Sequence, residues 1–220
     1  MRKKLTYEEK ELRKLAKEVS VHYETLPIEG RTVFDLGANV GLASKSFLER
    51  GAKHVVAVEP HPATYATLCA ALAPFGEDRF TAIQAAVVAP GAPPVLLYLH
   101  PKGRDPMHKL EPTRGWASVP VPSVSLEDLF AKHKPETLKI DIEHGEYFLP
   151  MLKAIPPFVT DVAIEFHGAM VFRGVSPGPK TIRMWELIES FENDQGFKRG
   201  YWDEKHWYDT AYAINAVYSR

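Results

Sequence analysis

The sequence holds a single cysteine, Cys69, and this scarcity excludes two kinds of site. One thiol cannot form an intramolecular disulfide, and it cannot supply a multi-cysteine metal site. The chain also lacks an apolar run of membrane-spanning length, and its N-terminal residues 1–4 are mostly charged rather than apolar. We therefore expect a cytoplasmic protein with no membrane partner.

An excess of charge of either sign is also missing. The 27 lysines and arginines nearly balance the 28 aspartates and glutamates, which leaves a formal net charge of −1 at pH 7. A protein that binds nucleic acid mainly through bulk electrostatics would be strongly basic, so this class is disfavoured, although a local basic patch stays open. Hydrophobic residues make up 45% of the chain, which is typical of a globular protein with a full core.

The length of 220 residues fits a single domain, 1–220. We expect an N-terminal helical extension over 1–25, with a charged amphipathic helix at 7–20. The core would then run over 26–220. Loop insertions are expected in it near 100–117 and 168–179, where proline and glycine are frequent.

Hydrophobic patterning in the core alternates strands with helices. Apolar runs without polar alternation, such as 54–58 and 162–166, indicate parallel strands that are covered on both faces. Further strands are predicted at 80–83, 95–99, 118–121, 138–141, 197–202 and 208–218, and helices at 42–51, 62–72, 125–133, 146–154 and 180–193. This order predicts an α/β fold with a doubly wound sheet, closed by an antiparallel pair of strands.

A glycine turn follows the first predicted strand, which begins at Thr32 and runs into FDLGANVG at 34–41. A strand, such a turn and a helix open a nucleotide-binding βαβ unit. Gly37 and Gly41 permit backbone conformations that a Cβ forbids, and the free N–H groups of the next helix attract a carboxylate or phosphate. Asp35 would repel a pyrophosphate but could accept hydrogen bonds from an ammonium group. The turn therefore suits an amino-acid ligand better than a dinucleotide.

Polar side chains end most of the predicted parallel strands. Ligands of open α/β sheets lie outside the carboxyl ends of the strands, so these residues form a candidate site. The set is Asp35, Glu59, Gln84, Asp141 and 165–167. Glu59 lies 22 residues beyond Gly37, an offset at which an acid commonly binds the two hydroxyls of a ribose. Gln84 could contact an adenine ring, and Asn39 could cap a helix that starts at Val40.

Three segments resemble the successive motifs of the FkbM family of class I S-adenosylmethionine (SAM)-dependent methyltransferases. They are FDLGANVG at 34–41, VAVEPHP at 56–62 and LKIDIEHGE at 138–146. IEFH at 164–167 is similar to the IExH of that family at its fifth strand. The similarity covers residues 31–170, and His144 stands where the family usually has glycine.

This resemblance implies a Rossmann-like fold with helices on both faces of a seven-stranded, mostly parallel sheet in the order 3-2-1-4-5-7-6. It also implies that SAM lies with its methionine part near Asp35 and Gly37, its ribose on Glu59 and its adenine near Gln84 and Ala85. The other residues expected at the cofactor belong to the same motifs and are Asn39, Gly41, Pro60 and Asp141.

Members of the family typically methylate hydroxyl oxygens, which implies O-methylation of a small molecule such as a sugar or natural product. The protein must position donor and acceptor, and a base must take the hydroxyl proton. His167 is the first candidate for this base, followed by Asp141 and His144. His167 could instead only hold the 168–179 loop.

A metal ion is an alternative use of the same side chains. Asp141, Glu165 and His167, together with Glu143, could coordinate Mg²⁺, which takes oxygen ligands. Acids at strand ends also simply bind the amino groups of ligands. Asp141 is thus shared between the metal and the cofactor hypotheses.

Other functions stay open at this point. A methyltransferase acting on RNA or another nucleic acid could use the basic loop at 100–116. An NAD-dependent dehydrogenase would need GxGxxG, but Asn39 stands at the second glycine. A SAM-binding module without catalysis would lack a base near the acceptor. The aromatic segment 201–208 favours a covered core edge over a surface that stacks a sugar or base. The sequence does not predict the oligomeric state.

Overall fold

The computed structural model describes residues 22–101, 108, 110, 112–143, 145–148, 150–169, 179–207 and 211–220. The helix expected at 7–20 lies outside these residues, as does His144. Much of the two expected loop insertions, at 102–107 and 170–178, also lies outside them.

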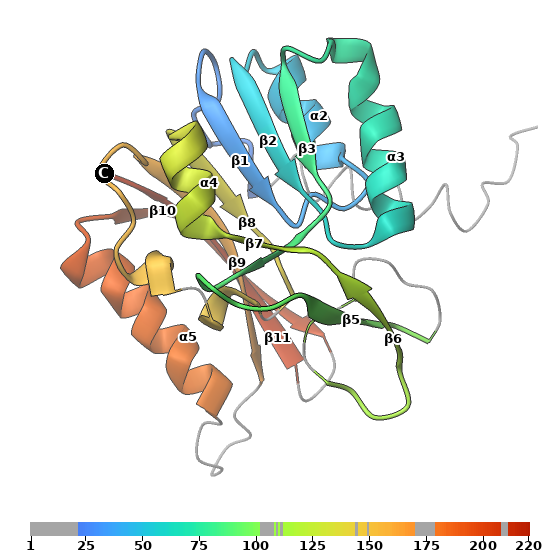
Figure 1. Cartoon of the computed structure of the whole chain (residues 1–220). Helices are drawn as coiled ribbons and strands as arrows, with labels where there is room; N and C mark the ends of the chain where they lie inside the picture. The colour runs from blue at the N-terminus through green and yellow to red at the C-terminus, as the bar shows by residue number, and fades with distance from the viewer. Residues whose placement is uncertain are drawn as a thin grey trace, which may run out of the picture.

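A seven-stranded sheet forms the centre of the protein (Figure 1). Its parallel strands are β1 (Thr32–Leu36), β2 (His54–Val58), β3 (Phe80–Ile83), β8 (Thr137–Ile140) and β9 (Asp161–Ala169). The strands β10 (Lys198–Trp207) and β11 (Ala211–Ser219) form the expected antiparallel pair, and β11 is also antiparallel to β9. The sheet order is β10-β11-β9-β8-β1-β2-β3. Counted over these seven strands alone, this is the expected order 3-2-1-4-5-7-6.

Helices cover both faces of this sheet (Figure 1). The helices α2 (Leu42–Glu49) and α3 (Pro62–Leu72) pack on one face, and η1 (Ala73–Phe75) extends α3. The helices α4 (Leu126–His133) and α5 (Pro179–Glu189) pack on the other face, and η5 (Ser190–Asp194) continues α5 as a π turn. Within the described part of the chain, no helix is long and apolar enough to cross a membrane.

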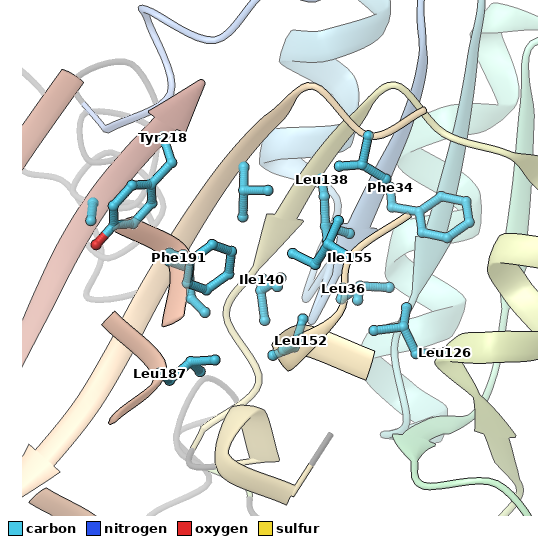
Figure 2. Packing of buried hydrophobic residues seen from close by; sticks show 14 of the residues in the cluster. Phe34, Leu36, Leu126, Leu138, Ile140, Leu152, Ile155, Leu187, Phe191 and Tyr218 are labelled. Carbon is cyan, nitrogen blue, oxygen red and sulfur yellow. The ribbon is translucent and has the colours of Figure 1, made fainter. Parts of the chain in front are cut away.

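The larger apolar cluster lies between the sheet and the helices α4 and α5 (Figure 2). In it the ring of Phe34 stacks on Phe130 with centroids 5.7 Å apart, and Phe191 stacks on Tyr218 at 5.1 Å. Because side chains alternate along a strand, burying Phe34 on this face turns its neighbour Asp35 toward α2. Truncating a buried phenylalanine costs about 3–5 kcal/mol, so the core fixes this orientation firmly.

Two small sheets accompany the central one. The strand β5 (Val95–Leu99) pairs with β6 (Ala117–Val121) as an antiparallel hairpin, close to the expected bounds. This hairpin lies beyond the carboxyl ends of β1, β2 and β3 (Figure 1). The parallel pair β4 (Ala86–Val88) and β7 (Ser123–Ser125) is absent from the sequence prediction. Each of its strands has three residues, too few to show a periodic pattern.

The prediction of an α-helix at 146–154 is wrong. The segment forms two short 3₁₀ turns, η3 (Gly145–Phe148) and η4 (Pro150–Lys153). Pro150 lies in the middle of the expected helix, where it lacks the N–H group that an α-helix needs. The other long helix predictions hold. Ser125 caps α4 as expected, because its Oγ accepts a hydrogen bond from the backbone N–H of Asp128 at 3.0 Å.

The closing strand β10 is longer than the expected 197–202, and it includes most of the aromatic segment 201–208. Tyr201 packs against the apolar cluster on the α2 side of the sheet. For Tyr201, this contact agrees with the prediction of a covered core edge.

Candidate active site

An open cavity lies at the carboxyl ends of β1, β2 and β8, where the general rule for open α/β sheets predicts a ligand site. The glycine turn 37–40 forms one wall, residues 59–60 after β2 form the next, and residues 141–143 follow β8. Residues 85–87 and Leu97 of the β5–β6 hairpin line the opposite side. The cavity therefore collects segments from all parts of the expected cofactor site.

Gly37 makes the turn possible. Its φ is 76°, and a Cβ added to it would lie 1.8 Å from the backbone oxygen of Asp141. The N–H groups of Gly37 and Ala38 both donate to the carbonyl oxygen of Val58, each at 3.0 Å. The turn is thus fixed between the ends of β2 and β8, at a place where only glycine fits.

Asn39 and Gly41 have roles that differ from the expected ones. Asn39 lines the cavity, but its Oδ1 accepts a hydrogen bond from the adjacent Val40 N–H at 2.7 Å. The expectation that Asn39 caps the helix is wrong, because Gly41 has a φ of 87° and α2 begins only after it. Gly41 is not among the residues that line the cavity. A Cβ on Gly41 would lie 2.8 Å from Leu68 of α3, so this glycine allows α2 and α3 to pack closely.

Asp35 does not reach the cavity. Its side chain is fully buried, its Oδ2 accepts a hydrogen bond from Ser44 Oγ at 2.6 Å, and its Oδ1 lies 2.9 Å from the Nζ of Lys139. Asp35 is expected near the methionine part of SAM, but its side chain is not among those that line the cavity, so a direct contact with the cofactor is not supported. Asp35 instead holds a lysine that itself lines the cavity.

Lys139 is a site residue that the sequence reasoning missed. Its Nζ donates to the carbonyl oxygen of Gly37 at 2.7 Å and lies 3.8 Å from an oxygen of Asp141. Burial acts to lower the pKa of Lys139, but the carboxylates of Asp35 and Asp141 outweigh it and raise this pKa. A lysine inside a strand that is covered on both faces needs an acidic partner, so the position of Lys139 in the strand predicted at 138–141 was the sequence feature that could have identified it. Lys139 ties the glycine turn to β8.

Glu59 lines the cavity at the end of β2. Its Oε1 accepts a hydrogen bond from the backbone N–H of His61 at 2.8 Å, and its Oε2 accepts one from the N–H of Asn39 at 3.0 Å. Burial raises the pKa of Glu59 to about 7, although these two backbone donors act to lower it. A carboxylate can accept about four hydrogen bonds, so Glu59 keeps capacity for a ligand. Pro60 and Ala85 also line the cavity, whereas Gln84 is not among its lining residues.

His167 lies buried on β9 among carboxylates. Its Nδ1 is 3.3 Å from Oε1 of Glu146, and its Nε2 is 3.8 Å from an oxygen of Asp141 and 3.8 Å from an oxygen of Glu143. Burial acts to lower the pKa of His167, but Glu143, Glu146 and Glu165 outweigh it and raise the pKa well above its ordinary value. The neighbouring carboxylates therefore favour the charged form of the ring. This direction counts against His167 as the base, and its role in catalysis stays a prediction.

Two carboxylates after β8, Asp141 and Glu143, line the cavity themselves. Glu143 has a φ of 49°, which is unusual for a residue with a Cβ, and burial raises its pKa to about 8. The residues expected for a metal ion also come together. One ligand atom each from Asp141, Glu165 and His167 lie within 4.8 Å of one another. Of these three, Asp141 alone is a lining residue of the cavity.

Comparison with known proteins places this site in a family. Residues 35–199 match the family model described as the methyltransferase FkbM domain. None of the curated proteins compared with the chain matches it.

Solved structures show the same fold at low identity. TYW2 of M. jannaschii, in complex with AdoMet, is 14% identical and matches 94% of this chain and 75% of its own, with a TM-score of 0.50. A Pyrococcus horikoshii protein described as a transferase is 13% identical over 93% of this chain and 62% of its own, with a TM-score of 0.52. A Streptococcus thermophilus protein described as a hemolysin is 17% identical over 100% and 69%, with a TM-score of 0.51. Together with the family match, which spans more than half of the sequence, the cavity and its motifs show that the chain belongs to the FkbM family of SAM-dependent methyltransferases.

Proposed function

We propose that this methyltransferase transfers the methyl group of SAM to a hydroxyl oxygen of a small molecule, such as a sugar or a natural product. One observation carries the proposal. The glycine turn for the cofactor and the carboxylates of Asp141 and Glu143 line the same cavity. A methyl donor and a group that can take a proton would therefore meet in one place.

The walls of the cavity suggest how SAM lies in it. Glu59 would accept hydrogen bonds from the two ribose hydroxyls, and the apolar surface of Pro60 and Ala85 would contact the adenine. The methionine part would reach the turn at Gly37. There Asp141, rather than the buried Asp35, would face its ammonium group.

For methyl transfer the protein mainly has to position the donor and the acceptor, and it does not have to form a covalent bond with either. The acceptor oxygen attacks the methyl carbon in line with the C–S bond, which breaks as the new O–C bond forms. The acceptor hydroxyl loses its proton, and Glu143 would receive it. Its pKa of about 8 leaves part of the side chain ionised at neutral pH and makes that carboxylate a stronger base than an ordinary glutamate. His167 would help to orient Asp141 and Glu143, since its Nε2 lies 3.8 Å from each. A catalytic role for His144 stays a prediction.

The charge of the site favours a small neutral acceptor over a nucleic acid. Asp141 and Glu143 line the cavity, Glu165 has an oxygen within 4.8 Å of one of Asp141, and the whole chain has a formal net charge of −1. A phosphate backbone would be repelled by such a cluster, whereas a hydroxyl group can donate hydrogen bonds to it.

The test is a methyl-transfer assay with radiolabelled SAM and a panel of hydroxylated sugars and natural products. In an active pairing, Glu143→Gln should lower kcat by about 10²–10⁴, which is the usual contribution of a general base. The affinity for SAM, measured by calorimetry, should stay within about twofold because Glu143 is not needed to bind the cofactor.

A matched variant controls for the loss of one acid. Glu29→Gln removes an exposed carboxylate near β1 that is not among the residues lining the cavity, and it should leave turnover unchanged. Turnover of Glu143→Gln equal to that of the parent would remove Glu143 as the proton acceptor. A chain that binds SAM but methylates only RNA would replace the small-molecule proposal.

A further inference from the structure

A row of polar side chains crosses three strands beside the cavity. The parallel register of β8 and β9 ends with Ile140 opposite Ile164, so Asp141 and Glu165 each follow that pair by one residue, and the antiparallel register of β9 and β11 pairs Glu165 with Asn215. His167 lies two residues beyond Glu165 and therefore leaves the same face of the sheet. One ligand atom each from Asp141, Glu165 and His167 lie within 4.8 Å of one another.

Two buried atoms next to this row lack a partner. Asn215 is 3% exposed, and its Nδ2 makes no hydrogen bond. Glu146 is 1% exposed, and its Oε2 makes none. A buried polar atom without a partner costs about 1–3 kcal/mol, so it calls for an explanation such as a ligand or ion. Asn215 stands opposite Glu165, and Glu146 contacts His167, so both atoms border the same place.

The surroundings of His167 are those of a metal ligand. Its Nδ1 lies 3.3 Å from Glu146 Oε1, an arrangement in which a carboxylate fixes one ring nitrogen and turns the other toward a cation. Its Nε2 lies 3.8 Å from oxygens of Asp141 and Glu143. This distance is too long for a hydrogen bond. It suits two ligands that share one ion at about 2.1 Å each.

We propose that Asp141, Glu165 and His167 bind a divalent transition cation of the Mn²⁺ type, which would take the place of a proton on the Nε2 of His167. In this site Asn215 would donate a hydrogen bond to an oxygen that the cation holds. A donor set of two carboxylates and one imidazole favours such a cation over Mg²⁺ or Ca²⁺, which prefer oxygen ligands alone.

The site adjoins the cavity through Asp141, so the cation could polarise the acceptor hydroxyl beside the methyl donor. The evidence for the metal site comes from the residues of the row and does not depend on the proposed function. Its use in methyl transfer rests on the proposed function.

Electron paramagnetic resonance tests the site directly, because bound Mn²⁺ loses the sharp signal of the free ion. The full chain should remove the signal of one Mn²⁺ per molecule. Variants His167→Ala and Glu165→Gln should each weaken binding by at least about tenfold, and Glu146→Gln by about 10–100-fold through the orientation of His167. The exposed Glu77→Gln should bind like the parent. Ca²⁺ should compete poorly with Mn²⁺.

A second variant guards against simple misfolding. Asn215→Asp adds a carboxylate beside Glu165, so we expect a lower Tm without metal, recovery with Mn²⁺ and about tenfold tighter Mn²⁺ binding. A free Mn²⁺ signal throughout, or equal affinity of His167→Ala and the parent, would overturn the proposal. Either result would mean that the charged imidazole alone neutralises the carboxylates. Calorimetry with SAM in the absence of metal separates this failure from a failure of the proposed function.

Discussion

The two walls of the cavity are built in different ways. Around Gly37 the wall consists of backbone: two N–H groups donate to one carbonyl oxygen, and the carbonyl of Asp141 occupies the space of a missing Cβ. After β8 the wall consists of charged side chains: Asp141 and Glu143 line the cavity, and the buried His167 lies next to them and to Glu146. The first wall depends on the missing Cβ of Gly37, and the second depends on the charges of its side chains.

This difference suggests a division of labour. A backbone wall gives the same shape whatever ligand is present, which suits a cofactor common to a whole family. A wall of carboxylates backed by a buried histidine costs free energy to keep in place, and its chemistry changes when any of these side chains is replaced, which suits the recognition of one particular acceptor. Lys139 joins the two walls, because it contacts Asp35, the carbonyl of Gly37 and Asp141 together.

The largest expected effect comes from breaking the backbone wall. Gly37→Ala would place a Cβ 1.8 Å from the oxygen of Asp141, so β1 or β8 would have to move. We expect a loss of at least about 4 kcal/mol in the free energy of unfolding, measured by urea denaturation. SAM binding should fall below detection in calorimetry.

Gly91→Ala is the matched control. Gly91 has a φ of 72°, close to that of Gly37, but nothing lies within 4 Å of an added Cβ. The control should therefore cost only the backbone strain of about 1–2 kcal/mol and leave SAM binding unchanged. Equal losses in the two variants would mean that backbone strain, and not the crowding by β8, makes glycine necessary at position 37.

Breaking the link between the walls should have the next largest effect. Lys139→Met leaves the carboxylate of Asp35 buried with Ser44 as its hydrogen-bond donor, which should cost about 3–5 kcal/mol of stability. The double variant Asp35→Asn, Lys139→Met removes both charges and should regain most of that stability. Its SAM affinity should stay low, because nothing then holds the carbonyl of Gly37.

A surface pair provides the comparison for this loss. Lys153 lies 3.9 Å from Glu186, and both side chains are more than half exposed. Lys153→Met should change stability by no more than about 1 kcal/mol, since water already screens the pair. If Lys139→Met were no more destabilising than this variant, Asp35 would be neutral or solvated and the link between the walls would not exist.

The sequence predicted the backbone wall well because its determinants are local. The turn at 34–41, the acid at Glu59 and the strand order all follow from hydrophobic patterns and glycines that are close together in the chain. The positions of Asn39, Gly41 and Asp35 within that wall were predicted less well. A motif shows that a residue is needed, but it does not show whether a side chain faces a ligand or the neighbouring layer.

The charged wall could be predicted only in part. Acids at the ends of strands predicted that Asp141, Glu165 and His167 meet, and they do. The partners that decide their chemistry come from elsewhere: Glu146 from a 3₁₀ turn that was expected to be a helix, and Asn215 from the last strand. Charge states depend on these distant contacts, so the sequence alone could not show that the pKa of His167 is raised.

The smallest effect concerns Glu59, a titratable group beside the backbone wall that itself lines the cavity. Burial raises the pKa of Glu59 to about 7, so its carboxylate loses its charge between pH 8 and pH 6. Ribose hydroxyls donate to the ionised form, and binding should therefore weaken as the pH falls. From the fraction ionised, the affinity should drop about tenfold from pH 8 to pH 6.

Methylthioadenosine is the best probe for this prediction, because it carries the ribose and adenine of SAM without the amino group that would titrate in the same range. Its Kd, measured by calorimetry at both pH values, should change about tenfold in the parent and stay constant in Glu59→Gln. A flat profile in the parent would place the ribose away from Glu59. An equal drop in the variant would assign the pH dependence to the charged wall around His167, and the two walls would then not act separately.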